Sequence, residues 1–276
     1  MCRTFPRLLL GGVALLVIAS CSSELKPVDQ SFLNSLGLEF VPVPGLSVWV
    51  CRTETRVKDY ALFLRETGHC WPGPGFAQTA QHPAVNVSWL DAKAFCDWLS
   101  QPEGRRYRLP TDAEWSVLGG VRPLERVGIA PKDQPPQPER HPWGNRPLSA
   151  GDGNLCDETF GKSEFGEGYE ARWLSGYNDG YSTTAPVARF RPDAHGIYDL
   201  AGNVWEWCED WYDPPARTLK VLRGASWRTG NPERHWSSYR GPDPPSCRLD
   251  SAGFRLVLEP ATQTDQSPAQ AQRALP

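Results

Sequence analysis

Residues 196–207 read GIYDLAGNVWEW, and this stretch carries the clearest structural signal in the chain. The run from Asn203 to Cys208 alternates in character, which predicts a β-strand. Trp205 and Trp207 each bring a large apolar area, so we interpret both as core residues. The stretch therefore predicts a strand that belongs to the core.

Short extended runs and helices flank this strand along the chain. Val221–Arg223 and Phe254–Leu258 predict two further strands. Apolar residues at helical spacing predict three helices, one that starts at Val57 and that Gly68 can end, one after Ser88 through residue 99, and a short one after Thr111. Thr111 and Glu114 form a capping-box pattern at the start of the third helix.

The composition indicates a globular, loop-rich chain. Its 276 residues include 12 Trp, 27 Pro and 25 Gly but a single Met, and the formal net charge is −3. A nucleic-acid-binding protein needs a basic footprint, which this charge does not provide. The fold therefore depends on aromatic packing, which we assign to Trp89, Trp98, Trp115, Trp205 and Trp207.

Three arginines lie next to core-like positions. Buried arginine normally needs a carboxylate partner. We therefore expect structural ion pairs between Arg108, Arg223 and Arg255 and the carboxylates of Asp112, Glu114 and Glu206.

The first 35 residues predict export. Arg3 and Arg7 precede a short apolar run, so residues 1–20 are interpreted as a signal peptide. The end of this segment resembles the lipobox of bacterial lipoproteins, which implies lipidation of Cys21, and Ser22 favours the outer membrane. The alternative is an ordinary secreted protein whose Cys21 is incidental. We expect a tether over 21–35, a folded domain over 36–260 and a disordered tail over 261–276.

Export changes the interpretation of the cysteines. In an oxidising compartment, an even number of cysteines favours disulfides of undetermined pairing. None of their spacings predicts a zinc site. The six cysteines of the predicted domain are Cys51, Cys70, Cys96, Cys156, Cys208 and Cys247.

Five motifs in a fixed order resemble the formylglycine-generating enzyme family, also called sulfatase-modifying factors. They occupy residues 82–89, 107–115, 196–207, 222–227 and 253–255. The resemblance covers about residues 40–258 and implies an α+β domain related to the C-type lectin fold, with little regular secondary structure.

The resemblance also implies two structural calcium sites. Calcium prefers six to eight oxygen ligands from mixed carboxylates and carbonyls. The alternative is that the aspartates are turn residues and that Glu206 pairs with an arginine. The implied ligands are Asp199, Gly202, Val204 and Glu206 at one site, and Asn154, Leu155, Asp179 and Tyr181 at the other.

The family's catalytic signature is missing. Catalytic relatives carry two cysteines, five residues apart, that bind copper and activate oxygen, and the matching positions here are Thr229 and Arg234. Neither side chain is a soft ligand of the kind that copper(I) requires. A further departure is Leu256, where many relatives carry a cysteine that bridges to the Cys96 position; Cys96 would then pair with Cys208 or Cys247, or stay free. We therefore expect no copper and no formylglycine-generating activity by that mechanism.

Two functions remain open. The first is a non-catalytic module that binds an exported protein or peptide, because Trp, Tyr and Arg dominate interface hot spots. Its expected ligand surface is Arg228, Arg234, His235, Trp236, Tyr239 and Arg240. The second is a modifying enzyme of the cell envelope that uses a different chemistry, in a cleft formed by Trp205, Ser226, Thr229 and Arg234.

Overall fold

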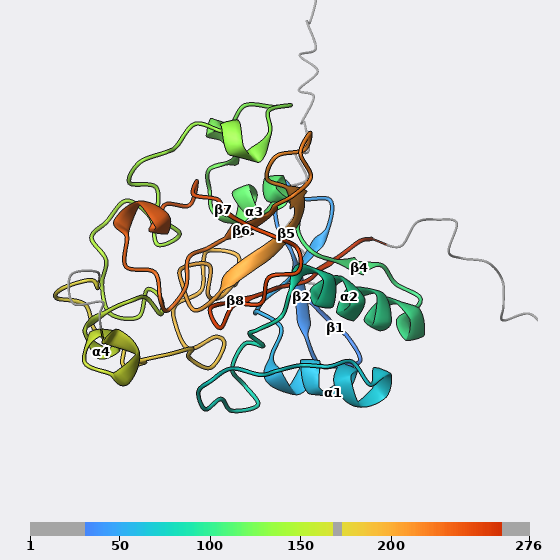
Figure 1. Ribbon diagram of the computed structural model, residues 1–276. Helices are drawn as coiled ribbons and strands as arrows, with labels where there is room; N and C mark the ends of the chain where they lie inside the picture. Colours follow the sequence, from blue (N-terminus) through green and yellow to red (C-terminus); the bar gives the residue numbers. More distant parts are fainter. Residues whose placement is uncertain (1–30, 168–172, 261–276) are drawn as a thin grey trace, which may run out of the picture. The chain divides into compact units, whose positions relative to one another are not determined.

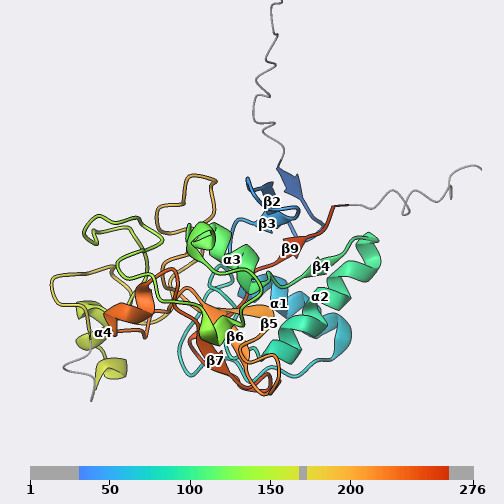
Figure 2. The same cartoon turned by 90° about the horizontal axis from the view of Figure 1, so that it is seen from above.

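The computed structural model describes residues 31–167 and 173–260 and contains two β-sheets (Figure 1). The larger sheet has the order β1-β2-β3-β9-β4, and the smaller one has the order β7-β6-β5-β8. Seen from above, β2, β3 and β9 lie together, while β5, β6 and β7 form a separate group (Figure 2). The strands are β1 (Phe32–Leu33), β2 (Glu39–Pro42), β3 (Trp49–Cys51), β4 (Tyr107–Arg108), β5 (Trp205–Trp211), β6 (Lys220–Arg223), β7 (Gly241–Asp243), β8 (Ala252–Gly253) and β9 (Val257–Leu258).

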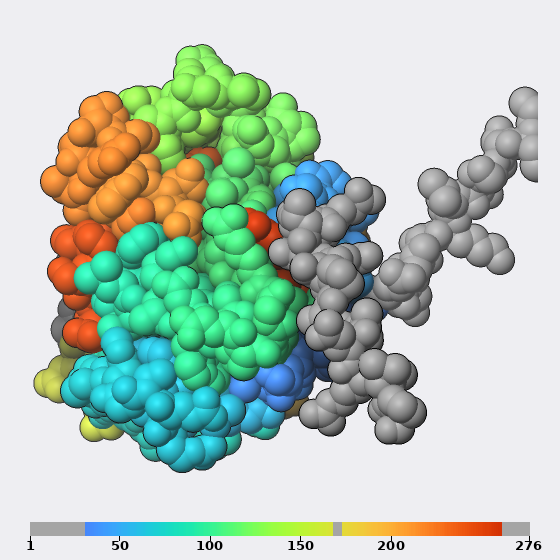
Figure 3. All heavy atoms as spheres, turned by 90° about the vertical axis from the view of Figure 1, so that its right-hand side faces the viewer, coloured from blue at the N-terminus to red at the C-terminus, as the bar shows by residue number. Residues whose placement is uncertain are grey.

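The three predicted helices are confirmed. Ser88 and Thr111 cap α2 and α3 through capping boxes, and Gly68 ends α1 in a left-handed conformation at φ 69°. The helices α1 and α2 lie against each other on the face that Figure 3 presents. The helices are α1 (Val57–Thr67), α2 (Trp89–Glu103), α3 (Asp112–Leu118) and α4 (Glu158–Gly161), with 3-10 turns η1 (Arg122–Leu124), η2 (Pro131–Asp133), η3 (Glu164–Gly166) and η4 (Pro232–His235).

The predicted strands are present with shifted bounds. The central strand β5 begins at Trp205, two residues later than predicted, and continues to Trp211. The predicted strand over 254–258 is regular only in β9. Before β9, the Leu256 carbonyl accepts from Cys51 N–H at the end of β3, and the Phe254 carbonyl accepts from Thr55 N–H. The Arg255 side chain between them turns inward to Glu206. The chain therefore passes from one sheet to the other within these residues.

The predicted aromatic core is largely present. Trp115 and Trp207 are fully buried and Trp205 is 9% exposed, whereas Trp89 and Trp98 are half-buried and pack on the main core. The ammonium of Lys220 lies 3.9 Å from the Trp89 ring centroid and 3.8 Å from that of Trp211. Such cation–π contacts stabilise a buried charge and hold both tryptophans in place.

The expected ion pairs are confirmed for all three arginines. Nη2 of Arg108 lies 2.7 Å from Glu114. Arg223 pairs with Asp112, and Nε of Arg255 lies 2.7 Å from Oε2 of Glu206. Arg223 and Arg255 have fully buried side chains, so these pairs lie within the core.

The ordered domain begins earlier than predicted, because β1 already pairs Phe32 with Phe40. The part of the chain described here contains no helix long and apolar enough to cross a membrane. The predicted signal peptide, Cys21 and the tail over 261–276 lie outside the described residues.

The cysteines differ from the expectation of disulfides. Cys51, Cys96 and Cys208 are buried free thiols, Cys70 is an exposed one, and Cys247 is a half-buried one. Burial raises the pKa of Cys51 to about 11, which keeps this thiol protonated. Cys96 lies within α2 in the main core, and Cys208 lies in a separate core cluster. Cys96 and both of its candidate partners, Cys208 and Cys247, are free thiols.

Candidate functional site

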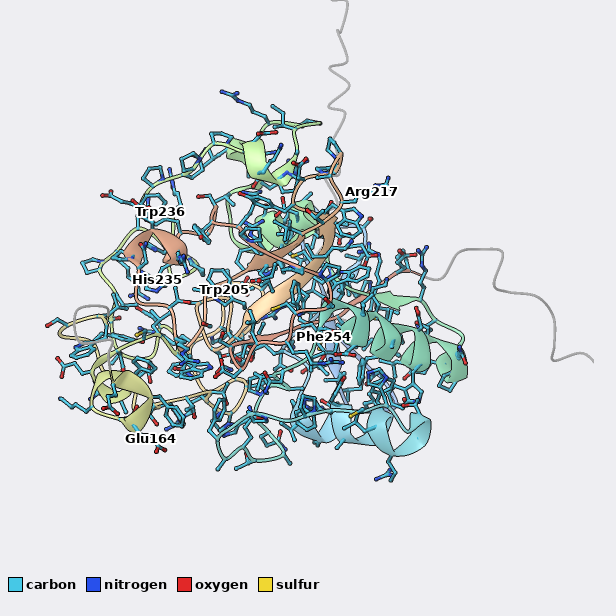
Figure 4. The ribbon with its side chains drawn as sticks, in the orientation of Figure 1. Glu164, Trp205, Arg217, His235, Trp236 and Phe254 are labelled. Atoms are coloured by element: carbon cyan, nitrogen blue, oxygen red, sulfur yellow. The ribbon has the colours of Figure 1, made fainter. Side chains whose placement is uncertain are left out.

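All four cleft candidates line one pocket. Trp205, Ser226, Thr229 and Arg234 border a cavity of about 640 Å³. Figure 4 labels Trp205 at the start of β5, with His235 and Trp236 in the segment beside it. The other lining residues are Leu222, Arg228, Tyr239, Gly241, Pro242, Asp243, Leu249 and Ser251, and we refer to the whole as the 205–251 pocket.

One side of the pocket is a hydroxyl-closed turn. Oγ1 of Thr229 accepts from the Ser226 backbone N–H at 3.1 Å and lies 3.0 Å from Oγ of Ser226. Oγ of Ser226 accepts from the backbone N–H of Arg228 at 3.3 Å. These bonds leave the Thr229 hydroxyl engaged in the turn.

The opposite side carries rings and cations. The Trp205 and Tyr239 ring centroids are 5.8 Å apart, and the Arg234 guanidinium lies 5.8 Å from the Tyr239 ring. Arg228 pairs with Asp250 at 2.8 Å, whereas exposed Arg234 has no carboxylate partner among the described residues. The pocket therefore presents one uncompensated guanidinium beside two aromatic rings.

Two residues expected on the ligand surface lie inside the protein instead. His235 is 5% exposed, and its Nε2 donates to the Thr229 carbonyl at 2.7 Å. Arg240 is 7% exposed and joins Asp112 and Glu125 in a buried network. His235 thus supports the Thr229 side of the pocket from within the protein. Of the expected surface, Arg228, Arg234, Trp236 and Tyr239 remain at least partly accessible.

Asp243 is a pocket residue that the sequence analysis missed. Burial raises the pKa of its carboxyl, although the Cys247 thiol hydrogen-bonds to it. Asp243 lies at the end of β7, and the antiparallel pairing of β7 with β6 brings it to the pocket. No local sequence signal marked this residue, because only the pairing of β7 with β6 places it on the pocket wall.

The implied calcium ligands around Asn154 and Asp179 include a buried oxygen that has no hydrogen-bond partner. Nδ2 of Asn154 donates to the Thr183 carbonyl and to Asn203, which leaves the buried Oδ1 of Asn154 without a hydrogen-bond partner. Asp179 accepts from the backbone N–H groups of Leu155 and Tyr181, so the four residues lie together. Burial raises the pKa of Asp179 to about 7, an effect that a bound cation would oppose. These residues fit a hard cation.

The implied calcium ligands of the 199–206 segment are also rich in oxygen atoms. Asp199 is 4% exposed; its Oδ2 accepts from Ala188 N–H at 2.7 Å, and its Oδ1 has no partner. Both oxygens of Glu206 accept from Arg255, and Oε2 also accepts from Trp115. The arginine pairing weighed for Glu206 is thus present. This pairing still leaves room for a cation at Glu206, because a carboxylate has about four lone-pair sites and the Arg255 and Trp115 bonds occupy three of them.

Backbone carbonyls are needed to complete either site. Among the described residues, no three His, Cys, Asp or Glu side chains gather closely enough to hold a metal ion. The two loops meet where Asn154 and Gly202 form a β-bridge and Asn203 N–H donates to the Asn154 carbonyl at 2.7 Å. Carboxylate, amide and carbonyl oxygens are the donors that calcium prefers.

Comparisons with known proteins agree with this architecture. A formylglycine-generating enzyme of Thermomonospora curvata is 34% identical over 190 residues, which is 68% of this chain and 49% of that protein. An inactive C-alpha-formylglycine-generating enzyme 2 of Mus musculus is 34% identical over 194 residues, which is 67% of this chain and 52% of that protein. The chain thus spans about half the length of these relatives.

Solved structures share the fold. PvdO from Pseudomonas aeruginosa superposes with a TM-score of 0.59 at 24% identity, covering 85% of this chain and 99% of PvdO. Treponema denticola variable protein 1 gives 0.52 at 22% identity, covering 85% of this chain and 100% of that protein. The model of the sulfatase-modifying factor enzyme 1-like domain matches residues 29–260. The chain therefore belongs to the family of sulfatase-modifying factor, or formylglycine-generating-enzyme-like, domains.

Proposed function

We propose that this chain is a non-catalytic binding module that takes a segment of an exported protein or peptide into the 205–251 pocket. One observation carries the proposal: Trp205, Ser226, Thr229 and Arg234 line one open pocket. By the sequence resemblance, Thr229 and Arg234 match the thiol positions of catalytic relatives. None of the residues that line it is a cysteine or a histidine. Copper(I) needs soft ligands, which these side chains do not supply.

The pocket wall has the composition of a recognition site. Trp, Tyr and Arg are enriched in interface hot spots, and Trp205, Tyr239 and Arg234 lie together here. The Ser226–Thr229 turn and buried His235 hold the wall rigid, which lowers the entropy lost on binding. The free guanidinium of Arg234 favours a ligand segment that contains a carboxylate.

Peptide selection tests this function. Peptides would be selected from a random display library on the purified chain, and their Kd measured on Arg234→Glu and on Arg126→Glu, an exposed control outside the pocket. We expect at least about a tenfold loss of affinity in the first variant and none in the second. Selected peptides that bind both variants equally would place recognition elsewhere.

The compartment and the ions complete the proposal. We expect lipidation at Cys21, anchoring in the bacterial cell envelope at the outer membrane, and two structural calcium ions held by the 154–181 and 199–206 segments. Metabolic labelling with a fatty acid tests the anchor, and the Cys21→Ser variant should carry no label. Metal analysis of chelator-free protein tests the ions, with two calcium and no copper or iron expected.

A modifying enzyme is the second candidate, and Asp243 is the observation that favours it. A carboxyl group with a raised pKa on a pocket wall can serve as a general acid or base. In that role, Asp243→Asn abolishes modification of a bound peptide, as followed by mass spectrometry, while leaving its Kd unchanged. If the wild-type chain returns the peptide unmodified, the enzyme candidate is wrong and binding is the remaining function.

A further inference from the structure

Exposed apolar side chains gather in one short segment of the chain. Leu124 is 42% exposed, Val127 83% and Ile129 36%, and the other exposed large apolar side chains of the described residues are Leu33 and Leu90. Single exposed apolar side chains are normal on a protein surface, whereas a group of them marks a contact surface. The group belongs to the 122–134 loop, which contains η1 and η2 and lies at the edge of the domain opposite α1 (Figure 1).

This loop is held in a fixed shape. The side-chain amide of Gln134 spans it, because Oε1 accepts from Arg126 N–H at 3.0 Å and Nε2 donates to the Arg126 carbonyl at 2.8 Å. The side chain of Glu125 is only 2% exposed, and a salt bridge ties it to the buried network of Arg240. Val127 and Ile129 lie between the two residues that Gln134 joins, so the fold itself imposes their exposure.

Cations accompany the apolar side chains. Arg126 is exposed and forms no salt bridge with a carboxylate of the described residues. The other two cations of the loop, Arg122 and Lys132, each lie beside a carboxylate, and the exposed acid of the loop is Asp133. The loop therefore combines an apolar tip with a guanidinium that no salt bridge neutralises. Apolar side chains beside basic ones are typical of segments that lie in the interface of an anionic membrane.

The position of Cys21 gives an independent reason to expect a membrane beside this domain. Cys21 precedes Ser31, the first described residue, by ten residues. Ten residues span at most about 36 Å when fully extended. A lipid on Cys21 would therefore keep the start of the domain within that distance of the bilayer. Across such a short connection, the effective concentration of the surface is on the order of millimolar.

We propose that the 122–134 loop docks on the surface of an anionic phospholipid bilayer. Leu124, Val127 and Ile129 enter the boundary between headgroups and acyl chains, and the Arg126 guanidinium binds lipid phosphates. This inference rests on the anchoring part of the proposed function for the presence of the membrane. It is independent of what the 205–251 pocket binds, because none of the residues that line that pocket belongs to the loop. Attachment through both the lipid and the loop would restrict how the domain turns on the membrane.

Vesicle flotation of the chain from Ser22 to Pro276 tests the proposal. This chain carries no lipid of its own, and it keeps the whole compact unit that begins at Ser31. The vesicles consist of phosphatidylethanolamine with phosphatidylglycerol, or of phosphatidylcholine alone as the neutral comparison. We expect the chain to float with the anionic vesicles at millimolar lipid and to float less with the neutral ones.

Two double variants assign the binding to the loop. Val127→Ser with Ile129→Ser should lower the partition coefficient at least about tenfold, because binding strength grows with the apolar area that the membrane buries. Leu33→Ser with Leu90→Ser is the matched control, since it removes two exposed leucines (65% and 53%) outside the loop and should leave partitioning unchanged. All four side chains are exposed, so the melting temperatures should stay close to that of the wild-type chain.

Arg126→Gln isolates the electrostatic contribution. We expect about a fivefold loss on anionic vesicles, because one basic residue near such a surface contributes about 1 kcal/mol, and no loss on neutral vesicles. An equal loss on both kinds of vesicle would refute the contact between Arg126 and lipid phosphate.

The docking surface and the lipid anchor can fail separately. A wild-type chain that stays in solution with anionic vesicles at millimolar lipid overturns the docking surface, even where fatty-acid labelling confirms the anchor. Flotation of the Ser22 chain without labelling of Cys21 in the full chain supports the loop and refutes the anchor. Equal losses in the two double variants overturn the role of the loop, because any exposed apolar side chain would then serve.

Discussion

The Thr229 carbonyl and Nε2 of His235 are joined by a 2.7 Å hydrogen bond, and both residues are buried. The imidazole therefore donates from inside the protein to the turn that forms one wall of the 205–251 pocket. A neutral imidazole suffices for this bond, and burial disfavours its charged form.

Stability should fall on mild acidification because of His235. Burial lowers the pKa of His235 to about 4, while the unfolded chain binds its proton near 6.5. Between these two values the unfolded state holds more protons, so the free energy of unfolding decreases as the pH falls, by about 3 kcal/mol in total from this group. Urea unfolding at pH 7, 5.5 and 4.5 measures the slope. His235→Gln retains a donor but does not titrate, and an equally steep slope in this variant would refute the assignment.

Restoring the family's thiols should restore copper binding. Thr229 and Arg234 line the same pocket, so Thr229→Cys with Arg234→Cys places two soft ligands on its wall. We expect the double variant to bind one copper(I) per chain in a chelator competition, well above the wild-type chain. The Thr229→Ser, Arg234→Ser double variant is the control. If it binds copper(I) as tightly as the cysteine variant, the correspondence of positions is incorrect.

Removing Asp112 should be severely destabilising. Its carboxylate pairs with both Arg223 and Arg240, whose side chains are 0% and 4% exposed. Asp112→Asn leaves two buried guanidiniums undercompensated, and breaking such a pair typically costs 3–5 kcal/mol, roughly. Asp213→Asn, which loses only the partly exposed pair with Lys132, should cost under about 1 kcal/mol in the same denaturant titration. Equal losses in the two variants would be inconsistent with a buried network.

Gly202 should be intolerant of any side chain. Its φ is +85°, and an added Cβ would lie 2.0 Å from the Asn154 carbonyl oxygen. Gly202→Ala therefore forces the two calcium-candidate loops apart. Gly68 has a similar φ of +69° but no atom within 4 Å of an added Cβ, so Gly68→Ala should cost only about 1–2 kcal/mol. Both variants carry the backbone strain of a positive φ, but only Gly202→Ala adds the close contact with Asn154. The difference between their melting temperatures therefore measures the cost of that contact.

The sequence predicts those parts of the structure that depend on neighbouring residues or on the pairing of buried charges. Ser88, Thr111 and Gly68 mark helix ends because capping requires only neighbouring residues. The arginine pairs were predictable because buried guanidinium tolerates few alternatives. The prediction that His235 lies on the ligand surface was wrong, because residue type does not reveal which side chain of η4 turns inward. Asp243 was missed, because its place in the pocket depends on the pairing of β7 with β6, which no local pattern reveals.

The position of β9 has a consequence for how the chain acquires its structure. β9 lies between β3 and β4, so Val50 and Arg108 meet in one sheet only through Val257. Contacts of such long sequence separation require closure of very large loops before they contribute stability, which slows folding. Helices α1 to α3 can form early from local signals, but they have no completed sheet to pack on until residues 257–258 dock. The larger sheet is therefore completed only when residues 257–258 dock, and until then the edges of β3 and β4 that face β9 stay unpaired and open to aggregation.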